Sequence, residues 1–360
     1  MRFPEFHGEW EKCKLGDIAE FSTARISSVK LDCKNYVSTE NMLQDFQGVV
    51  EAKSVPNETN VISFTCGDIL ISNIRPYLKK VWKATFDGGC SSDVFVLQAT
   101  DTVAKDYLHY AVANDKFINY VMSGAKGVKM PRGDKKQMRT YQLSLPSIQE
   151  QYKIAKLLTL LDERIATQSK LIEKLESLIK GIAQHCIREL INGWEYVRLG
   201  DICKITTGKL DANAQVENGQ YPFFTCAERP FNIDSYAFDT EALLISGNGA
   251  NLGYINYYKG KFNAYQRTYV LDHFSVNIQY VKWALNVLLP QRIAIEKSSS
   301  NTPYIVLSTL ADLKIPIPNN SKQNHIADLM MSFERKLSTQ LALSDLYNKQ
   351  KQYLLRQMFI

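Results

Sequence analysis

The stretch that decides the fold occurs twice in this chain. Residues 10–18 read WEKCKLGDI and residues 194–202 read WEYVRLGDI, so that six of nine positions are identical at an offset of 184. A second pair of segments closes each copy: 146–158 reads PSIQEQYKIAKLL and 318–330 reads PNNSKQNHIADLM, at an offset of 172. Matches that keep their order and nearly keep their offset indicate an internal repeat.

Two shorter matches lie between these segments. Residues 69–72 (ILIS) recur as 243–246 (LLIS), and residues 95–97 (FVL) recur as 269–271 (YVL), both at an offset of 174. One such match arises easily by chance, whereas four in register over the whole chain do not. We interpret the chain as two tandem copies of one unit, with Asn192-Gly193 as the stop and joint between them.

Composition is that of a globular protein with real cores. The 360 residues are 45% hydrophobic and 22% charged, which predicts two or three domains. No apolar run is long enough for a membrane span and the N-terminus lacks a signal-peptide pattern, so we expect no membrane partner. Seven dispersed cysteines without a CxxC pair argue against a structural zinc site and favour reduced thiols in the cytoplasm.

Each copy ends in a segment whose apolar residues step by three and four. This spacing predicts two helices of about 40 residues, roughly 60 Å each, that pair as a coiled coil. Two independent surface helices are the alternative, but such helices rarely run this long. The expected interface consists of Ile154, Leu158, Leu161, Ile165, Gln168, Ile172, Leu175, Ile179, Ile326, Met330, Phe333, Leu337, Gln340, Tyr347 and Leu354.

The region between the repeated segments mixes strand and helix patterns. Short apolar runs bounded by Gly, Asn and Asp predict strands, and longer amphipathic runs predict helices. The expected strands are 68–72, 94–98, 242–246 and 268–271, and the expected helices are 107–121 and 281–296. The fold class is therefore α+β, with two tandem α/β regions.

The doubled arrangement resembles the specificity subunit of a type I restriction-modification system. That family opens each half with W-x-x-x-x-L-G-D-I and closes it with a P-x-x-x-E-Q-x-x-I-A-x-x-L helix. The closing pattern is carried here by Pro146, Glu150, Gln151, Ile154, Ala155 and Leu157, and again by Pro318, Gln323, Ile326, Ala327 and Leu329, with Lys322 in place of the Glu. Residues 127–131 also resemble the family's loop before the last strand, and 301–303 are their counterpart.

The resemblance implies target recognition domains at 1–147 and 193–318, and conserved spacer helices at 148–192 and 319–360 that pair antiparallel. Each recognition domain is expected to read one half of a split double-stranded DNA target. Two modification subunits, which bind S-adenosylmethionine and methylate adenine, are the expected partners. Restriction subunits, which translocate and cleave DNA with Mg and ATP, are expected to join them. The chain itself is expected to hold no catalytic centre, metal or cofactor.

A search for catalytic signatures agrees with this expectation. Residues 301–304 (NTPY) depart from the Asn-Pro-Pro-Tyr loop that holds a flipped adenine, and residues 246–253 carry GxGxxxG rather than GxGxxG. We interpret the second stretch as a turn. No Walker A or HExxH string occurs, and the five histidines are isolated.

The candidate DNA contacts are clustered polar groups in otherwise nearly neutral halves. Residues 1–150 carry a net charge of +1 and residues 194–318 a net charge of 0, which argues against indiscriminate DNA binding. Residues 124–139 hold six basic side chains against one acidic. The first copy offers Arg75, Lys79, Lys80, Lys83, Lys126, Lys129, Arg132, Lys135 and Lys136, and the second offers Asn248, Asn251, Gln266, Arg267, Ser299 and Asn301.

The first set consists of Lys and Arg, whereas the second consists mainly of Asn, Gln and Ser, and this difference suggests a function. Asn and Gln suit bidentate contacts to adenine and Arg suits guanine, so the two copies would read different half-sites of an asymmetric, bipartite target. The alternative for the basic stretches is a solvated loop. Two further alternatives for the chain are a duplicated scaffold without DNA binding and a stand-alone DNA methyltransferase.

The antiparallel pairing yields a prediction about two glutamines. Equivalent residues of such a pair face each other only near its middle, where Gln168 lies. Gln168 and Gln340 should therefore meet and fix the register of the coiled coil. An experimental structure with these side chains more than about 10 Å apart would contradict this pairing.

Overall fold

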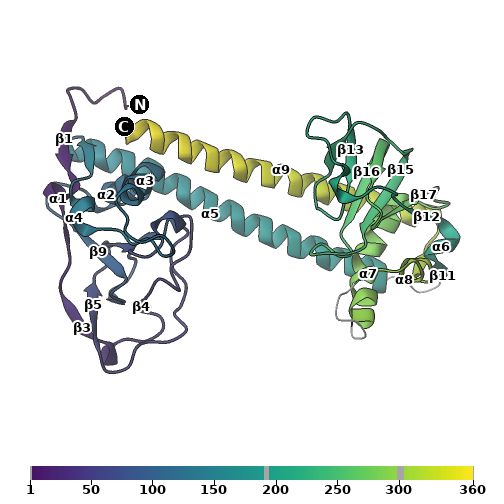
Figure 1. The fold of residues 1–360 in the computed structure, drawn as a ribbon, viewed down its shortest axis with the longest axis horizontal. Coiled ribbons are helices and arrows are strands. Elements are labelled where there is room, and N and C mark those ends of the chain that lie inside the picture. Colours follow the sequence, from purple (N-terminus) through teal and green to yellow (C-terminus); the bar gives the residue numbers. More distant parts are fainter. Residues whose placement is uncertain (1, 190–193, 298–303, 360) are drawn as a thin grey trace. The chain divides into compact units, whose positions relative to one another are not determined.

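The computed structural model describes residues 2–189, 194–297 and 304–359. The chain divides into two compact units (Figure 1): unit 1 is Met1–Gln168 with Leu343–Ile360, and unit 2 is Ser169–Ala342. Each unit thus takes one end of each long helix. The division expected from the sequence, with the helices as segments of their own, stays a proposal.

Unit 1 has three small sheets within its described residues. β1 (Glu11–Lys14) pairs with β10 (Gln142–Leu145). A second sheet has the order β2 (Ala19–Phe21), β9 (Val94–Ala99), β6 (Ile69–Ser72) and β7 (Val81–Lys83). A third has the order β3 (Arg25–Ser27), β5 (Asn60–Phe64), β8 (Gly88–Cys90) and β4 (Tyr36–Val37). The short helices are α1 (Leu15–Ile18), α2 (Lys105–Val112), α3 (Asp115–Ser123) and α4 (Lys135–Arg139), with 3₁₀ turns η1 (Ser28–Lys30) and η2 (Pro76–Leu78).

Unit 2 repeats this plan with one larger sheet. β11 (Glu195–Arg198) pairs with β18 (Lys314–Ile317). The larger sheet has the order β12 (Lys204–Thr207), β17 (Thr268–Asp272), β15 (Phe238–Ser246), β16 (Ile255–Ala264), β13 (Tyr221–Phe224) and β14 (Phe231–Ile233). The helices are α6 (Leu199–Ile202), α7 (Ile278–Lys297) and α8 (Leu307–Ala311), with the 3₁₀ turn η4 (Ala212–Ala214).

The central strand pairs of the two units share one register. β6 pairs antiparallel with β9 so that Ile69 lies opposite Leu97, and β15 pairs with β17 so that Leu243 lies opposite Leu271. Both residues are shifted by the same 174 positions. Because the apolar run 69–72 is buried on both faces, its register is strongly specified. The predicted strands at all four places are confirmed.

The two long helices are α5 (Ile148–Gln184), which continues into the π turn η3 (His185–Glu189), and α9 (Asn320–Met358). In unit 1, Ile154 at the start of α5 shares a core with Leu354 at the end of α9. In unit 2, Ile179 at the end of α5 shares a core with Ile326 at the start of α9. The pair is therefore antiparallel, which confirms that prediction of fold (Figure 1).

Burial along the seam follows the steps of three and four. The seam residues are buried at Ile154, Leu158, Gln168, Ile172, Leu175, Ile179, Ile326, Met330 and Leu354, and half-buried at Leu161, Ile165, Phe333, Leu337, Gln340 and Tyr347. Leucines off the seam, such as Leu160 and Leu178, are exposed. Gln168 belongs to unit 1 and Gln340 to unit 2, and their pairing stays a prediction.

One detail of the expected helices is corrected. The helix expected at 107–121 is two helices, because Asn114 interrupts it: its side chain accepts a hydrogen bond from the Phe117 amide (3.0 Å) and donates to the Tyr110 carbonyl (2.9 Å). An asparagine that bonds its own backbone favours caps over helix interiors. The expected joint at Asn192-Gly193 lies outside the described residues.

A buried glutamine fastens the start of each long helix to its unit. Gln151 accepts from the Ala104 amide (2.8 Å) and donates to the Pro146 carbonyl (2.9 Å). Gln323 repeats both bonds, from the Asn277 amide (3.0 Å) and to the Pro318 carbonyl (2.9 Å). These contacts give the shared glutamine of the closing pattern a physical role.

The position before this glutamine explains where the second copy departs from the pattern. Glu150 is fully buried and accepts two hydrogen bonds from the Arg2 guanidinium, at 3.0 and 2.9 Å. Its counterpart Lys322 is exposed, so the second copy has no buried carboxylate to neutralise there.

Among the residues that the structure describes, no helix combines the length and apolar character that a membrane-spanning segment needs. All seven cysteines are free thiols.

We predict that Gln151→Ala and Gln323→Ala each cost about 1–3 kcal/mol in the free energy of unfolding, because each leaves a buried backbone N–H without a partner. Urea denaturation of the purified chain measures this loss. The matched control is Gln350→Ala, since Gln350 is exposed on α9. Equal stabilities of all three variants would contradict the role assigned to the buried glutamines.

We also predict a pH dependence of unit 1 that comes from His109. Burial, with repulsion from Lys351 and Lys83, lowers the pKa of His109 to about 4, and among the described residues its buried Nδ1 has no hydrogen-bond partner. The unfolded histidine titrates near 6.5, so the folded state loses stability as the pH falls from about 6.5 to about 4, by about 3 kcal/mol. His109→Gln should reduce this dependence of the free energy of unfolding on pH, measured by urea titrations at several pH values. His7→Gln, at an exposed position, should leave it unchanged; equal slopes in both variants would contradict the assignment.

Candidate nucleic-acid interface

Three segments of unit 1 are joined by backbone hydrogen bonds at the β6–β7 loop (residues 73–80). The Asn73 amide donates to the Asp93 carbonyl (2.8 Å), and the Gly133 amide donates to the Asn73 carbonyl (3.0 Å). The Arg75 amide donates to the Pro131 carbonyl (2.8 Å). The two basic stretches that the sequence singled out, 75–83 and 124–139, therefore meet at one place.

Asp93, the residue directly before β9, contributes an acidic side chain to this junction. The Arg132 guanidinium lies 3.0 Å from the Asp93 carboxylate, and both side chains are partly exposed. Arg132 and Lys126 exchange backbone hydrogen bonds of 2.9 and 3.0 Å, which closes the loop between them. The exposed tip of that loop holds Lys129 with the apolar Val128 and Met130.

Unit 2 builds the same junction. The Gly247 amide donates to the Arg267 carbonyl (2.8 Å), and the Ile305 amide donates to the Gly247 carbonyl (2.9 Å). The run 246–253 is the turn between β15 and β16, as predicted. A Cβ on Gly247 would lie 2.4 Å from the Arg267 carbonyl oxygen, so glycine is needed there for the close approach of two backbones.

The structure gives several of the predicted basic residues an internal partner. The Lys79 ammonium lies 2.8 Å from the Asp115 carboxylate, Lys80 donates to the Thr39 carbonyl (2.6 Å), and Lys83 pairs with Asp106. Burial, together with the nearby Arg75, lowers the pKa of Lys80. These lysines can offer charge to DNA but already have fixed positions in the fold.

The predicted residues of helix α4 divide in the same way. Lys135 lies over the rings of Phe21 and Phe95, 5.3 and 4.7 Å from their centroids, and burial lowers the pKa of Lys135. Lys136 is exposed. Lys135 thus packs onto the sheet through cation–π contacts, whereas Lys136 remains accessible.

The predicted residues of unit 2 are also placed differently from one another. Gln266 and Arg267 are exposed beside the junction, whereas Asn248 and Asn251 are half-buried. The Asn251 amide donates to the Cys226 carbonyl (3.1 Å), so its NH₂ group holds a loop in place. Ser299 and Asn301 lie outside the described residues.

Sequence reasoning missed Asp93 and the apolar groups at the junction. Tyr77 is 48% exposed and Met130 46% exposed in unit 1, and Tyr304 is 54% exposed in unit 2. The signal that finds Asp93 was present, because the offset of 174 that aligns β9 with β17 also aligns Asp93 with Arg267.

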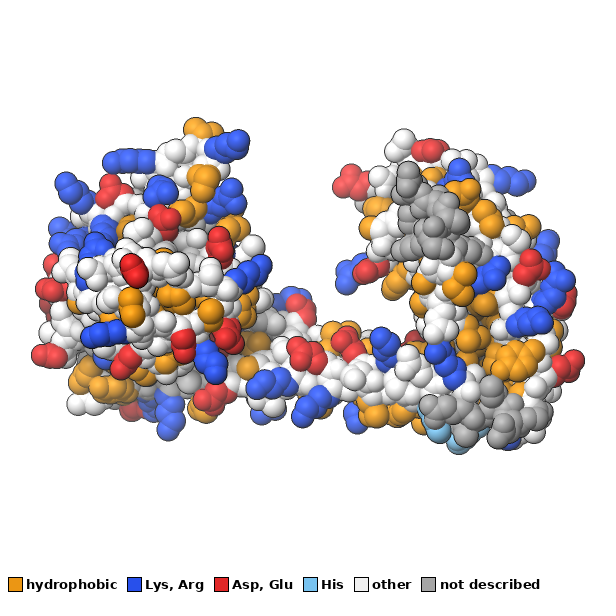
Figure 2. Space-filling model, turned by 90° about the horizontal axis from the view of Figure 1, so that it is seen from below, with side chains coloured by type: hydrophobic (Ala, Val, Ile, Leu, Met, Phe, Trp, Pro, Cys, Tyr) orange, Lys and Arg blue, Asp and Glu red, His pale blue; other side chains and the backbone are white. Residues whose placement is uncertain are grey.

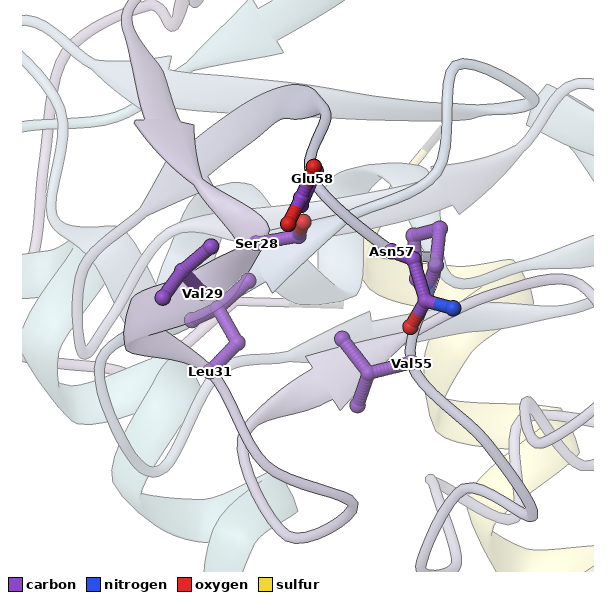
Figure 3. Close-up of a pocket in the computed structure, with 7 residues that line it drawn as sticks. Ser28, Val29, Leu31, Val55, Asn57 and Glu58 are labelled. Atoms are coloured by element: carbon purple, nitrogen blue, oxygen red, sulfur yellow. The ribbon is translucent and has the colours of Figure 1, made fainter.

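Charges on the visible face of each unit are interspersed rather than gathered into one basic surface (Figure 2). Such a surface suits specific contacts better than indiscriminate attraction to phosphates. A separate shallow pocket in unit 1 is lined by Ser28, Val29, Leu31, Val55, Pro56, Asn57 and Glu58 (Figure 3). Within the described residues no three of His, Cys, Asp and Glu are grouped as metal ligands would be.

Comparison with known proteins agrees with the doubled architecture. The family model for the type I restriction modification DNA specificity domain matches residues 7–177 and again residues 191–343. The EcoDI specificity subunit of Escherichia coli is 44% identical over 149 residues, which are 41% of this chain and 31% of that subunit. The MjaVIII specificity subunit of Methanocaldococcus jannaschii is 22% identical over 92% of this chain and 89% of its own length.

Solved structures show the same fold. The type I restriction-modification S subunit from M. genitalium superposes with a TM-score of 0.69 at 16% identity, covering 100% of this chain and 99% of its own. A chain from a study of type I R-M assembly and conformational transition gives a TM-score of 0.61 at 19% identity, covering 98% of both chains. With two matches that cover most of its length, the chain belongs to the family of type I restriction-modification DNA specificity domains.

Proposed function

We propose that this chain is the DNA-reading subunit of a type I restriction-modification complex, and that units 1 and 2 each read one half of a split target. One observation carries the proposal. The two units repeat the same strand register and the same junction bonds, yet carry different polar side chains at equivalent places. A shared frame with divergent side chains is what two readers of different sequences need.

The charged and polar side chains at the junctions support sequence-specific rather than non-specific DNA binding. In unit 1 Arg75, Lys129 and Lys136 are exposed on or directly beside the segments that backbone hydrogen bonds join at the junction. In unit 2 Gln266 and Arg267 are exposed at the places equivalent to residues 92 and 93 of unit 1. Phosphate contacts from the lysines would set the register on the duplex, while arginine and amide groups would contact base edges.

The proposal assigns the chemistry to partners. Two modification subunits would bind S-adenosylmethionine and methylate adenine, and restriction subunits would use Mg and ATP. Two quasi-equivalent units favour two copies of one partner, because equivalent surfaces bind equivalent subunits. The chain would act in the cytoplasm, bind no cofactor and carry no catalytic group.

The proposed division of the chain assigns 1–147 and 193–318 to target recognition, and 148–192 and 319–360 to the paired helices. The start of α5 at Ile148 and of α9 at Asn320 supports these boundaries.

We predict that exchanging residues 1–147 for those of a relative with another target changes only one half of the methylated sequence. Adenine methylation is mapped across the host genome with the gene intact, deleted, and replaced by the chimera. Deletion should abolish methylation of one split motif, and the chimera should restore a motif with one half new and one half unchanged.

The matched control exchanges residues 193–318 and should change the other half. Unchanged methylation after deletion, with the chain demonstrably expressed and no second copy in the genome, would contradict the proposal and favour a scaffold without DNA binding.

A further inference from the structure

The β6–β7 loop of unit 1 and the β15–β16 loop of unit 2 are the same loop with different side chains. Residues 73–80 and 247–254 are equal in length and offset by 174. The Ser72 amide donates to the Lys80 carbonyl (2.9 Å), and the Ser246 amide donates to the Tyr254 carbonyl (3.0 Å), so both loops close on equivalent atoms.

The two loops share their left-handed positions as well. The third and seventh residues have positive φ in both: Arg75 (51°) and Lys79 (54°) in unit 1, Gly249 (80°) and Gly253 (83°) in unit 2. Glycine adopts this conformation without a steric penalty, whereas an L side chain does so at a cost in free energy. Unit 1 therefore keeps two basic side chains where unit 2 shows that glycine suffices for the fold.

Contacts within unit 1 account for Lys79 but not for Arg75. The Lys79 ammonium pairs with Asp115 of α3 at 2.8 Å. Arg75 is exposed, and within the described residues its guanidinium has no hydrogen bond or ion pair. Together with burial, the charge of Arg75 lowers the pKa of the neighbouring Lys80. Arg75 therefore lowers the stability of unit 1 twice, through its left-handed backbone conformation and through repulsion of the Lys80 charge. A residue that is kept at such a cost in a fixed loop points to a role in binding rather than in folding.

A second exchange occurs across the junction. The position that accepts the loop's first amide is Asp93 in unit 1 and Arg267 in unit 2, with equivalent bonds of 2.8 Å. Asp93 forms an ion pair with Arg132 at 3.0 Å. Tyr304 occupies the place of Arg132 in unit 2, and Arg267 is exposed, its guanidinium without a hydrogen bond or ion pair among the described residues.

Resting on the proposed function, we propose that Arg75 in unit 1 and Arg267 in unit 2 are specificity-determining residues that each contact a guanine edge, from non-equivalent positions of one frame. Guanine presents the N7 and O6 acceptors that a guanidinium fork binds bidentately. Unit 2 has Gly249 where unit 1 has Arg75, and unit 1 has Asp93 where unit 2 has Arg267. The two half-sites would therefore carry their guanines at different places relative to the two equivalent loops.

The test uses the chain assembled with its modification subunits on a DNA library in which the mapped target is randomised, with sequencing of methylated adenines. Arg75→Gly should reduce the preference for guanine at one position of one half-site from roughly 10–100-fold to about 3-fold or less. Arg267→Asp should do the same at one position of the other half-site. All remaining positions should keep their preferences.

Thermal unfolding supplies the second readout. Arg75→Gly should raise the Tm of the chain by about 2 °C while it loses base preference, because glycine relieves the left-handed residue. The matched control is Glu58→Gly: Glu58 has a φ of 42° and lies in the pocket of Figure 3, apart from the junction. This control should raise the Tm similarly and leave the motif unchanged.

The proposal is overturned if both arginine variants keep every base preference, or if they weaken methylation of all targets uniformly, as loss of a phosphate contact would. These outcomes leave the proposed function standing when the wild-type complex still methylates a split motif. Absence of any motif with the wild-type complex would overturn the proposed function and this inference together.

Discussion

The packing of the end of the chain against the start of the first long helix is the contact on which unit 1 depends. Leu354 and Met358 of α9 lie in the same core as Ile154 and Leu158 of α5 and as the buried Tyr107 of α2. Unit 1 therefore completes its core only with residues that lie about 200 positions further along the sequence than Ile154 and Leu158. Antiparallel pairing makes this possible, and it gives unit 2 the complementary ends of both helices.

The two units show how a frame can be kept while its surface changes. Backbone hydrogen bonds carry the frame: the register of the central strands, the bond that closes each loop and the bonds to the third segment recur with nearly equal lengths. Backbone hydrogen bonds do not depend on which side chain a residue carries. They therefore restrict the residue type only at positions such as Gly247, where a Cβ would collide with a neighbouring carbonyl. Side chains on the exposed side of the frame are free to differ, and that side is where recognition is proposed.

Much of the fold was predictable because buried positions produce a regular pattern of apolar residues in the sequence. The buried strands at 69–72 and 243–246 are continuous apolar runs, and the seam of the long helices follows steps of three and four. The break between α2 and α3 was missed because a single side chain, Asn114, decides it through local hydrogen bonds. Likewise the repeated glutamine was visible in the sequence, but its role was not, because Gln151 accepts its hydrogen bond from the Ala104 amide, 47 residues away.

The candidate site was predictable only as loops. A basic count cannot distinguish Lys83, which pairs with Asp106, or Lys135, which lies over aromatic rings, from an unpaired arginine, because flexible lysine side chains find partners that only the fold brings near. The left-handed backbone of Arg75 has no sequence signal of its own. It becomes meaningful by comparison with the glycine at the same place in the second copy.

The most direct test of the account is a hydroxyl-radical footprint of the chain with its modification subunits on DNA that carries the mapped motif. Two readers of a split target should protect two short tracts with an accessible gap between them. Exchange of one recognition region should abolish protection of one tract on that DNA and leave the other. A single continuous tract, or protection that does not depend on the motif, would contradict the claim that the two units read two separate half-sites.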